Sequence, residues 1–111
     1  MMIDDLQYAV HVTAVDKGFW TTPVNLGEKV ALIHSELSEL LEAYRENPHA
    51  ACDKPIPLTR EQEEMSDVLI RLLDLAEHRG IDLMRAAEIK HAYNLTRSPK
   101  HGRKFCCLGA R

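Results

Sequence analysis

An all-α fold is predicted for this chain of 111 residues from three observations. Hydrophobic residues make up 45% of the chain and charged residues 28%, but aromatic residues only 5%. Glycine and proline are scarce, with five of each. Apolar residues recur at helical spacing in four segments. This combination is typical of a small helical bundle rather than of a β-rich or disordered protein. The length suits a single domain spanning residues 1–111.

The first helix is expected at about residues 3–17 and carries two apolar stripes. Its stripes are Leu6, Val10 and Ala14 on one side, and Tyr8, Val12, Val15 and Phe19 on the other. A helix with two apolar faces is usually sandwiched between neighbours, and a second subunit is one candidate neighbour.

The second helix is expected at residues 26–46, because Asn25 is a suitable N-cap and an apolar stripe follows it. The segment after it, "NPHAACDKPIPL", contains three prolines and is predicted to be a loop. A connection of this length allows the second and third helices to lie antiparallel.

The third and fourth helices are expected at residues 60–79 and 82–97. Thr59 opens a capping-box pattern before the third helix, and Gly80 ends it. Asp82 is the expected N-cap of the fourth helix. The connection between these helices is short, which favours an antiparallel pair in a small four-helix bundle-like protomer.

Charge and cysteine content exclude some classes of protein. The net charge of -3 argues against stable binding to nucleic acid, although the C-terminal tail "KHGRKFCCLGAR" is basic. The three cysteines form neither a disulfide framework nor a zinc-binding pattern. No apolar run approaches the roughly 20 residues of a membrane span, and acids stand where a signal peptide has basic residues. A cytoplasmic protein that does not bind membranes is therefore expected.

Two pairs of acids lie next to the packing surfaces of the second and third helices. Glu36 and Glu39 form one pair, Glu64 and Asp67 the other, and each pair has the spacing i,i+3 that places both residues on one helix face. Glu36 falls inside an apolar arc, where a carboxylate needs a partner. If the helices pack side by side, the four acids converge, and a divalent cation would remove their repulsion. Oxygen ligands favour Mg²⁺, with Mn²⁺ as a substitute, over zinc.

Two alternatives to this metal site are open. In the first alternative, the acids form a solvated helix face, with an ion pair between Asp67 and Arg71 at i,i+4. The second is a di-iron site, which needs a Glu-x-x-His pair on each of two helices. Only the pair of Glu88 and His91 lies on a predicted helix, which is not enough.

The fourth helix offers a strip of polar residues at i, i+4 and i+7: Lys90, Asn94 and Arg97. Two cations and an amide on one strip suit a phosphate chain and its ribose or base. The alternative is an ordinary enrichment of cations near a helix C-terminus, where they complement the helix dipole.

The ordered set of these residues resembles the MazG-like nucleoside triphosphate pyrophosphohydrolases of the all-α superfamily. The likeness extends from "KGFW" through "LIHSELSELLEAYR" and "MSDVLIRLLDLAEHRGIDL" to "KHAYNLTRSPKHGRKF". It implies Mg²⁺-dependent hydrolysis of nucleoside triphosphates to the monophosphate and pyrophosphate, as in clean-up of the nucleotide pool. Many members carry a further glutamate where this chain has Ser35.

The resemblance also implies roles for single residues. The implied metal ligands are Glu36, Glu39, Glu64 and Asp67, and the implied substrate contacts are Lys90 and Asn94, with Arg97 in support. Glu39 is the first candidate for the general base, because it lies nearer the solvent edge of its helix. Trp20 is a candidate for stacking on the base, and the alternative is a packing role.

A homodimer or homotetramer is expected, because four short helices cannot cover the apolar arcs predicted here. The resemblance implies the same assemblies. The rival hypothesis, from another functional class, is a non-catalytic helical dimer that acts as an interaction or regulatory module and whose acids are merely solvated.

Overall fold

The computed structural model describes residues 1–99, and this part of the chain is helical, with no strand. Its elements are α1 (Ile3–Asp16), α2 (Leu26–Glu46), α3 (Arg60–His78) and α4 (Leu83–Leu95). The predicted all-α class is confirmed, and no helix end differs from its predicted position by more than two residues. The predicted basic tail from Lys100 onward lies outside the described residues.

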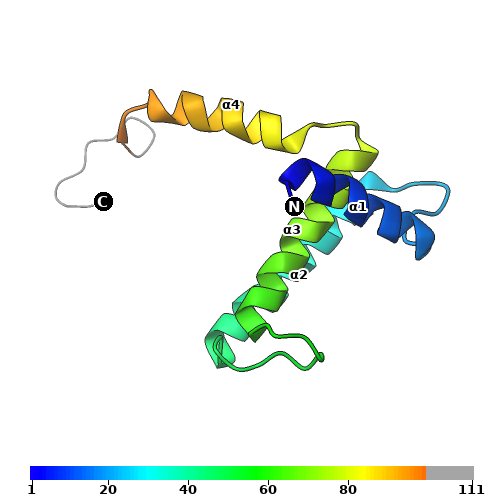
Figure 1. Cartoon of the computed structure of the whole chain (residues 1–111), viewed down its shortest axis with the longest axis vertical. Coiled ribbons are helices and arrows are strands. Elements are labelled where there is room, and N and C mark those ends of the chain that lie inside the picture. Colours follow the sequence, from blue (N-terminus) through cyan, green and yellow to red (C-terminus); the bar gives the residue numbers. More distant parts are fainter. Residues whose placement is uncertain (100–111) are drawn as a thin grey trace. The chain divides into compact units, whose positions relative to one another are not determined.

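The chain divides into two compact units, Met1–Ile81 and Asp82–Arg111. Unit 1 contains α1, α2 and α3, and unit 2 contains α4. Within unit 1, both α1 and α2 pack against α3. Helices α2 and α3 lie side by side and run antiparallel, as predicted (Figure 1). The predicted antiparallel pairing of α3 with α4 stays a prediction.

The helix ends follow the local signals in the sequence. The Asn25 side chain accepts a hydrogen bond from the backbone N–H of the third residue after it, and Asp82 does the same. Thr59 and Gln62 form a complete capping box. Gly80, with a φ of +67°, follows α3 in the left-handed conformation that side chains other than glycine rarely adopt. These predicted starts and stops are confirmed.

Helix α1 packs on α3, and its predicted stripe of Leu6, Val10 and Ala14 is half-buried. Gln7 is buried and its amide donates to Glu77 Oε1 at 3.2 Å and to the carbonyl oxygen of Ile81 at 2.8 Å. The second stripe is exposed, with 64% of Tyr8 and 61% of Phe19 accessible to solvent. Within unit 1, α1 is therefore covered on one side, not sandwiched.

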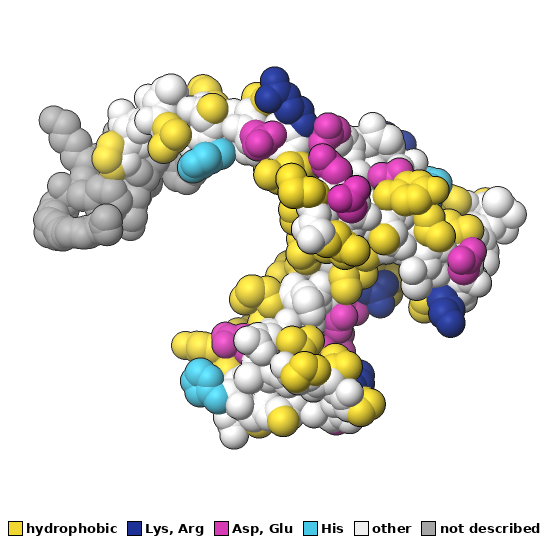
Figure 2. Space-filling view, viewed as in Figure 1, with side chains coloured by type: hydrophobic (Ala, Val, Ile, Leu, Met, Phe, Trp, Pro, Cys, Tyr) yellow, Lys and Arg dark blue, Asp and Glu magenta, His cyan; other side chains and the backbone are white. Residues whose placement is uncertain are grey.

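The hydrophobic core of the described residues is small. Its buried members are Ala43, Cys52, Leu73 and Ala76. Apolar residues in helical register stay exposed on α2 (Val30, Leu37, Leu41 and Tyr44) and on α3 (Met65, Leu69 and Leu72). Figure 2 shows hydrophobic side chains spread over the visible surface. Unit 1 thus leaves an apolar stripe exposed to solvent on each of its three helices.

No helix in the described part of the chain combines the length and the hydrophobicity needed to cross a lipid bilayer.

Candidate metal centre

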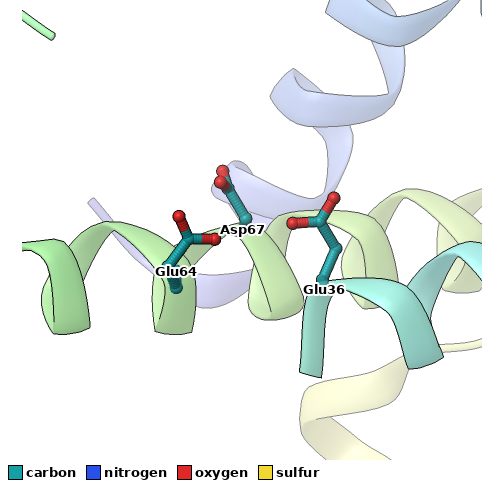
Figure 3. A group of neighbouring side chains, drawn as sticks. All are labelled: Glu36, Glu64 and Asp67. Atoms are coloured by element: carbon teal, nitrogen blue, oxygen red, sulfur yellow. The ribbon is translucent and has the colours of Figure 1, made fainter. Parts of the chain in front are cut away.

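Three of the four predicted acids come together between α2 and α3. Glu36 projects from α2, and Glu64 and Asp67 project from α3 one turn apart. One carboxylate oxygen of each lies within 4.8 Å of the corresponding oxygens of the other two, and the groups turn toward one another (Figure 3). The i,i+3 spacing on α3 and the antiparallel packing of α2 on α3 produce this cluster.

Glu36 occupies the buried edge of the cluster, with only 8% of the residue exposed. Its Oε1 accepts a hydrogen bond from Arg71 Nε at 2.8 Å, which forms an ion pair between α2 and α3. The prediction that a carboxylate at this position needs a partner is confirmed. Arg71 bonds Glu36 on the neighbouring helix instead of Asp67 on its own, so the ion pair of the solvated-face alternative does not form.

The pKa values of two clustered acids, Glu64 and Asp67, are raised. Burial raises the pKa of Asp67, and the charge of Glu36 raises it further. Burial is also the main cause of the raised pKa of Glu64, followed by the charge of Glu39. Lys54 and, to a smaller extent, Arg71 oppose these effects at Asp67 but do not cancel them. Burial and neighbouring carboxylates thus disfavour the charged forms of Glu64 and Asp67.

Glu39 lies next to the three clustered acids, on the exposed side of α2. The charge of Glu36 is the first cause of its raised pKa, and a smaller desolvation effect follows. Glu39 is not one of the three residues whose oxygens converge within 4.8 Å. Its predicted roles as fourth ligand and general base stay predictions, and its raised pKa makes it a stronger base than an isolated glutamate.

The loop before α3 adds a cation near these acids. Lys54 Nζ lies 2.8 Å from Glu63 Oε2 and 3.1 Å from Asp53 Oδ1. Glu63 is buried, 8% exposed, and its pairing with Lys54 explains how this charge is tolerated close to the clustered acids. The loop is held to α3 by a backbone hydrogen bond of 2.8 Å from the N–H of Arg60 to the carbonyl oxygen of Ala50.

A cavity of about 290 Å³ opens beside the cluster and is mostly apolar. Glu36 and Asp67 form part of its wall. The rest of the lining comes from α1, from the segment that follows α1, and from α2 and α3: Val10, Thr13, Ala14, Phe19, Trp20, Lys29, Leu32, Ile70, Arg71, Asp74 and Leu75. The volume approaches the lower end of the range for small-molecule sites. The acids therefore stand at the wall of a site large enough for part of a ligand.

Trp20 lines this cavity and makes several contacts of its own. Its Nε1 donates to Asp74 Oδ1 at 2.9 Å, and its ring stacks on that of His78 with centroids 4.1 Å apart. Lys29 Nζ lies 4.2 Å from the ring centroid. The Trp20 ring is therefore already in contact with an aromatic ring and with a cation. A base could stack on Trp20 only where these two groups leave the ring uncovered.

Asp74 on α3 contacts both α1 and the segment of residues 17–25, which contains Trp20 and is called the Trp20 segment below. Besides the Trp20 contact, its Oδ1 lies 2.7 Å from His11 Nδ1, and the Asp74 side chain is only 16% exposed. The sequence indicated a role for Trp20, but it indicated neither the contact of Trp20 with Asp74 nor that of His11 with Asp74. His11 and Trp20 are separated from Asp74 by 63 and 54 positions, and no local pattern signals contacts of that separation.

The predicted substrate contacts from the fourth helix lie in unit 2. Lys90 and Asn94 are on α4, and Arg97 follows its end. Lys90 Nζ lies 5.0 Å from the Tyr93 ring centroid and Arg97 Cζ lies 5.7 Å from it, so both cations gather on one aromatic side chain. The prediction that they share one side of the helix agrees with these contacts. Their binding to a nucleotide stays a prediction.

Comparisons with protein-family models, with curated proteins and with solved structures found no match for the chain.

Proposed function

We propose that the protein is a Mg²⁺-dependent hydrolase that cleaves nucleoside triphosphates to the nucleoside monophosphate and pyrophosphate. The observation that carries this proposal is the convergence of Glu36, Glu64 and Asp67 from two helices at the wall of a cavity. The ordered residues that resemble the MazG-like pyrophosphohydrolases support it. In this proposal the enzyme acts in the cytoplasm on the nucleotide pool.

The residues of the cluster fit a hard divalent cation. All three offer carboxylate oxygens, the ligands that Mg²⁺ and Mn²⁺ prefer, and no cysteine or histidine belongs to the group. Burial first, and then the charges of neighbouring acids, raise the pKa values of Glu64 and Asp67, and a nearby cation would favour their ionised forms. A bound Mg²⁺ would supply that positive charge, neutralise phosphate oxygens and lower the pKa of a bound water.

The remaining steps fall to side chains of this chain. The cavity beside the cluster would hold the nucleoside, with Trp20 as part of its wall. Water attacks the α-phosphorus, Glu39 accepts a proton from it, and the bond from the α-phosphorus to the bridging oxygen breaks to release pyrophosphate. Lys90 and Asn94 contact the phosphates and sugar in this proposal, and Arg97 supports them.

Ser35 bears on the number of acids at the site. Its hydroxyl donates to the carbonyl oxygen of Leu32 at 2.9 Å, within its own helix, and the residue is exposed. It therefore does not replace the further glutamate that many MazG-like proteins carry here. The site we propose relies on the four acids of the two pairs alone.

We further propose that the active protein is a homodimer or a homotetramer. Each of α1, α2 and α3 keeps an apolar stripe exposed, and unit 1 buries only four hydrophobic residues. Apolar surface of this extent usually meets another subunit.

Product analysis tests the function directly. The protein is incubated with a panel of ribo- and deoxyribonucleoside triphosphates and Mg²⁺, and the products are separated and identified. We expect monophosphate and pyrophosphate. Diphosphate and orthophosphate would mean cleavage at the other anhydride bond, and either those products or no turnover at all would contradict the proposal.

A non-catalytic helical dimer is the second candidate, because the exposed apolar stripes favour an interaction module as much as an enzyme. Thermal unfolding with Mg²⁺, with chelator and with a nonhydrolysable nucleotide separates the two. A ligand that binds the native state raises the melting temperature. A melting temperature that responds to none of these additions would favour the interaction module.

A further inference from the structure

Three cationic side chains of unit 1 stand near the carboxylate cluster: Lys29, Lys54 and Arg71. Two of them line the cavity, Lys29 and Arg71. Lys54 lies close enough to lower the pKa of Asp67. An incoming triphosphate carries more negative charge than a single divalent cation neutralises, so a protein cation is expected to contact it.

Both lysines are already engaged by other groups. Lys54 Nζ contacts two carboxylates, those of Asp53 and Glu63, at 3.1 and 2.8 Å. Lys29 Nζ donates to the carbonyl oxygen of Phe19 and lies over the ring of Trp20. A phosphate would have to compete with these partners for either ammonium group.

Arg71 is engaged at one nitrogen only. Its Nε donates to Glu36 Oε1, and within residues 1–99 its two terminal nitrogens have no hydrogen-bond partner. The side chain is 37% exposed and lines the cavity together with Glu36 and Asp67. A guanidinium has five N–H donors, so four donors stay available beside the acids.

We propose that Arg71 is a substrate-binding residue whose terminal nitrogens hold a phosphate group of the triphosphate while its Nε keeps Glu36 in position. The inference rests on the proposed function and deepens it by adding a phosphate contact that belongs to unit 1. The planar fork of a guanidinium matches two oxygens of one phosphate, which an ammonium group cannot do.

The ion pair with Glu36 is compatible with this double role. Arg71 occupies Oε1 of Glu36, which leaves Oε2 for a metal ion. Hydrogen bonds from neighbouring groups commonly orient metal-binding carboxylates in this way. Arg71 also lies one helical turn after Asp67, so a phosphate on the cluster stands within reach of its terminal nitrogens.

The test measures two affinities separately, on the wild type and on the variants R71Q and R71K. Calorimetry gives the affinity for a triphosphate with a nonhydrolysable α,β-bridge and for inorganic pyrophosphate, both with Mg²⁺. Mn²⁺ binding without nucleotide gives the affinity of the cluster for metal alone. R45Q is the matched control, because Arg45 is exposed on α2 and does not line the cavity.

We expect R71Q to weaken binding of the triphosphate and of pyrophosphate about tenfold or more, the usual effect of losing hydrogen bonds to a charged group. R71K is expected to recover part of this loss, and R45Q to bind like the wild type. Mn²⁺ affinity should change much less than nucleotide affinity in R71Q.

Two results would overturn the inference. In the first, R71Q binds the nucleotide and pyrophosphate as tightly as the wild type does. In the second, R71Q loses as much affinity for Mn²⁺ as for the nucleotide, which would leave Arg71 only a positioning role toward Glu36.

The same measurements separate this inference from the proposed function. If the wild type hydrolyses nucleotides and R71Q binds them normally, this inference fails and the proposed function stands. If the wild type binds pyrophosphate through Arg71 but hydrolyses no nucleotide, the proposed function fails instead. A wild type that binds neither ligand would refute both.

Discussion

Among the three clustered acids, Glu36 is the one whose surroundings combine burial with an ion pair to another helix. It is buried, paired with Arg71 and grouped with two further acids. We expect Glu36→Gln to lower Mg²⁺-dependent turnover by about 100-fold or more, because even residues that only support metal ligands change activity by 10- to 100-fold. Steady-state hydrolysis assays at saturating Mg²⁺ measure the effect.

The control for this substitution is Glu42→Gln, the same chemical change at an exposed position of α2. Circular dichroism should show unchanged helicity in both variants, because glutamine keeps the shape of glutamate and still accepts a hydrogen bond from Arg71. Equal activity of the two variants would remove Glu36 from the catalytic site.

The raised pKa values at the cluster give the metal-free protein a defined pH response. The pKa values of Glu64 and Asp67 exceed the ordinary values of 4.5 and 3.8, so the folded state binds protons more tightly than the unfolded chain. The stability gained from these protons is full below the ordinary values and is lost as the pH rises through the raised pKa values.

A bound metal must reverse this trend, because it requires the ionised acids. The rise in melting temperature caused by Mg²⁺ should be absent near about pH 4 and should grow as the pH passes the raised pKa values. Thermal scans with Mg²⁺ and with chelator across this range measure the difference. A shift of the same size at every pH would show that these carboxylates do not bind the ion.

The helices themselves were largely predictable because their signals are local. The caps at Asn25, Thr59 and Asp82 and the stop at Gly80 depend on a few neighbouring residues, and all four were identified from the sequence. The sequence also predicts that four acids of α2 and α3 converge, and the structure brings three of them together, Glu36, Glu64 and Asp67.

Contacts that depend on tertiary packing were not predictable. Arg71 has Asp67 at i-4 on its own helix, and only the approach of α2 decides that it pairs with Glu36. The pairing of Lys54 with Glu63 likewise depends on the path of the loop before α3. The junction at Asp74 joins segments more than 50 positions apart.

The Asp74 junction is expected to hold α1 and the Trp20 segment on α3. Asp74→Ala leaves His11 and Trp20 without their acceptor in a mostly buried setting, and we expect a loss of about 2 kcal/mol or more in the free energy of unfolding. Trp20→Phe removes the indole N–H and should cost about 1 kcal/mol or more. Urea denaturation of both single variants and of the double variant gives their coupling.

The coupling free energy between the Asp74 and Trp20 substitutions shows whether the two side chains stabilise the fold through their mutual contact or independently. If Trp20 acts through Asp74, its replacement should cost less in the Asp74→Ala background, by about 1 kcal/mol. Thr59→Ala is the control, because it removes a capping hydrogen bond at the other end of α3. It should cost about 1 kcal/mol by itself and add independently to Trp20→Phe. If the losses in the free energy of unfolding caused by Trp20→Phe and Asp74→Ala simply add in the double variant, Trp20 does not act through Asp74 and the junction is refuted.

At the scale of the whole molecule, the balance of buried and exposed apolar residues points to assembly. Four hydrophobic residues are buried in the described chain, while leucines in helical register stay in contact with solvent. The apolar stripe of α2 is the longest, because it runs from Val30 through Leu37 and Leu41 to Tyr44, about 20 Å along the helix. Its near-heptad spacing suits packing against a second helix.

We therefore expect the protein to have at least twice its chain mass of 12.6 kDa in light scattering at micromolar concentration.

Leu41→Glu places a charge on the α2 stripe and should shift the population toward the monomer, because a buried unpaired charge destabilises an interface. Ala31→Glu adds the same charge to α2 at an exposed position off the stripe and should leave the mass unchanged. A wild type with the mass of a single chain would refute the assembly. If Leu41→Glu kept the wild-type mass, the α2 stripe would not be the interface, and the exposed stripe of α1 would be the next surface to change.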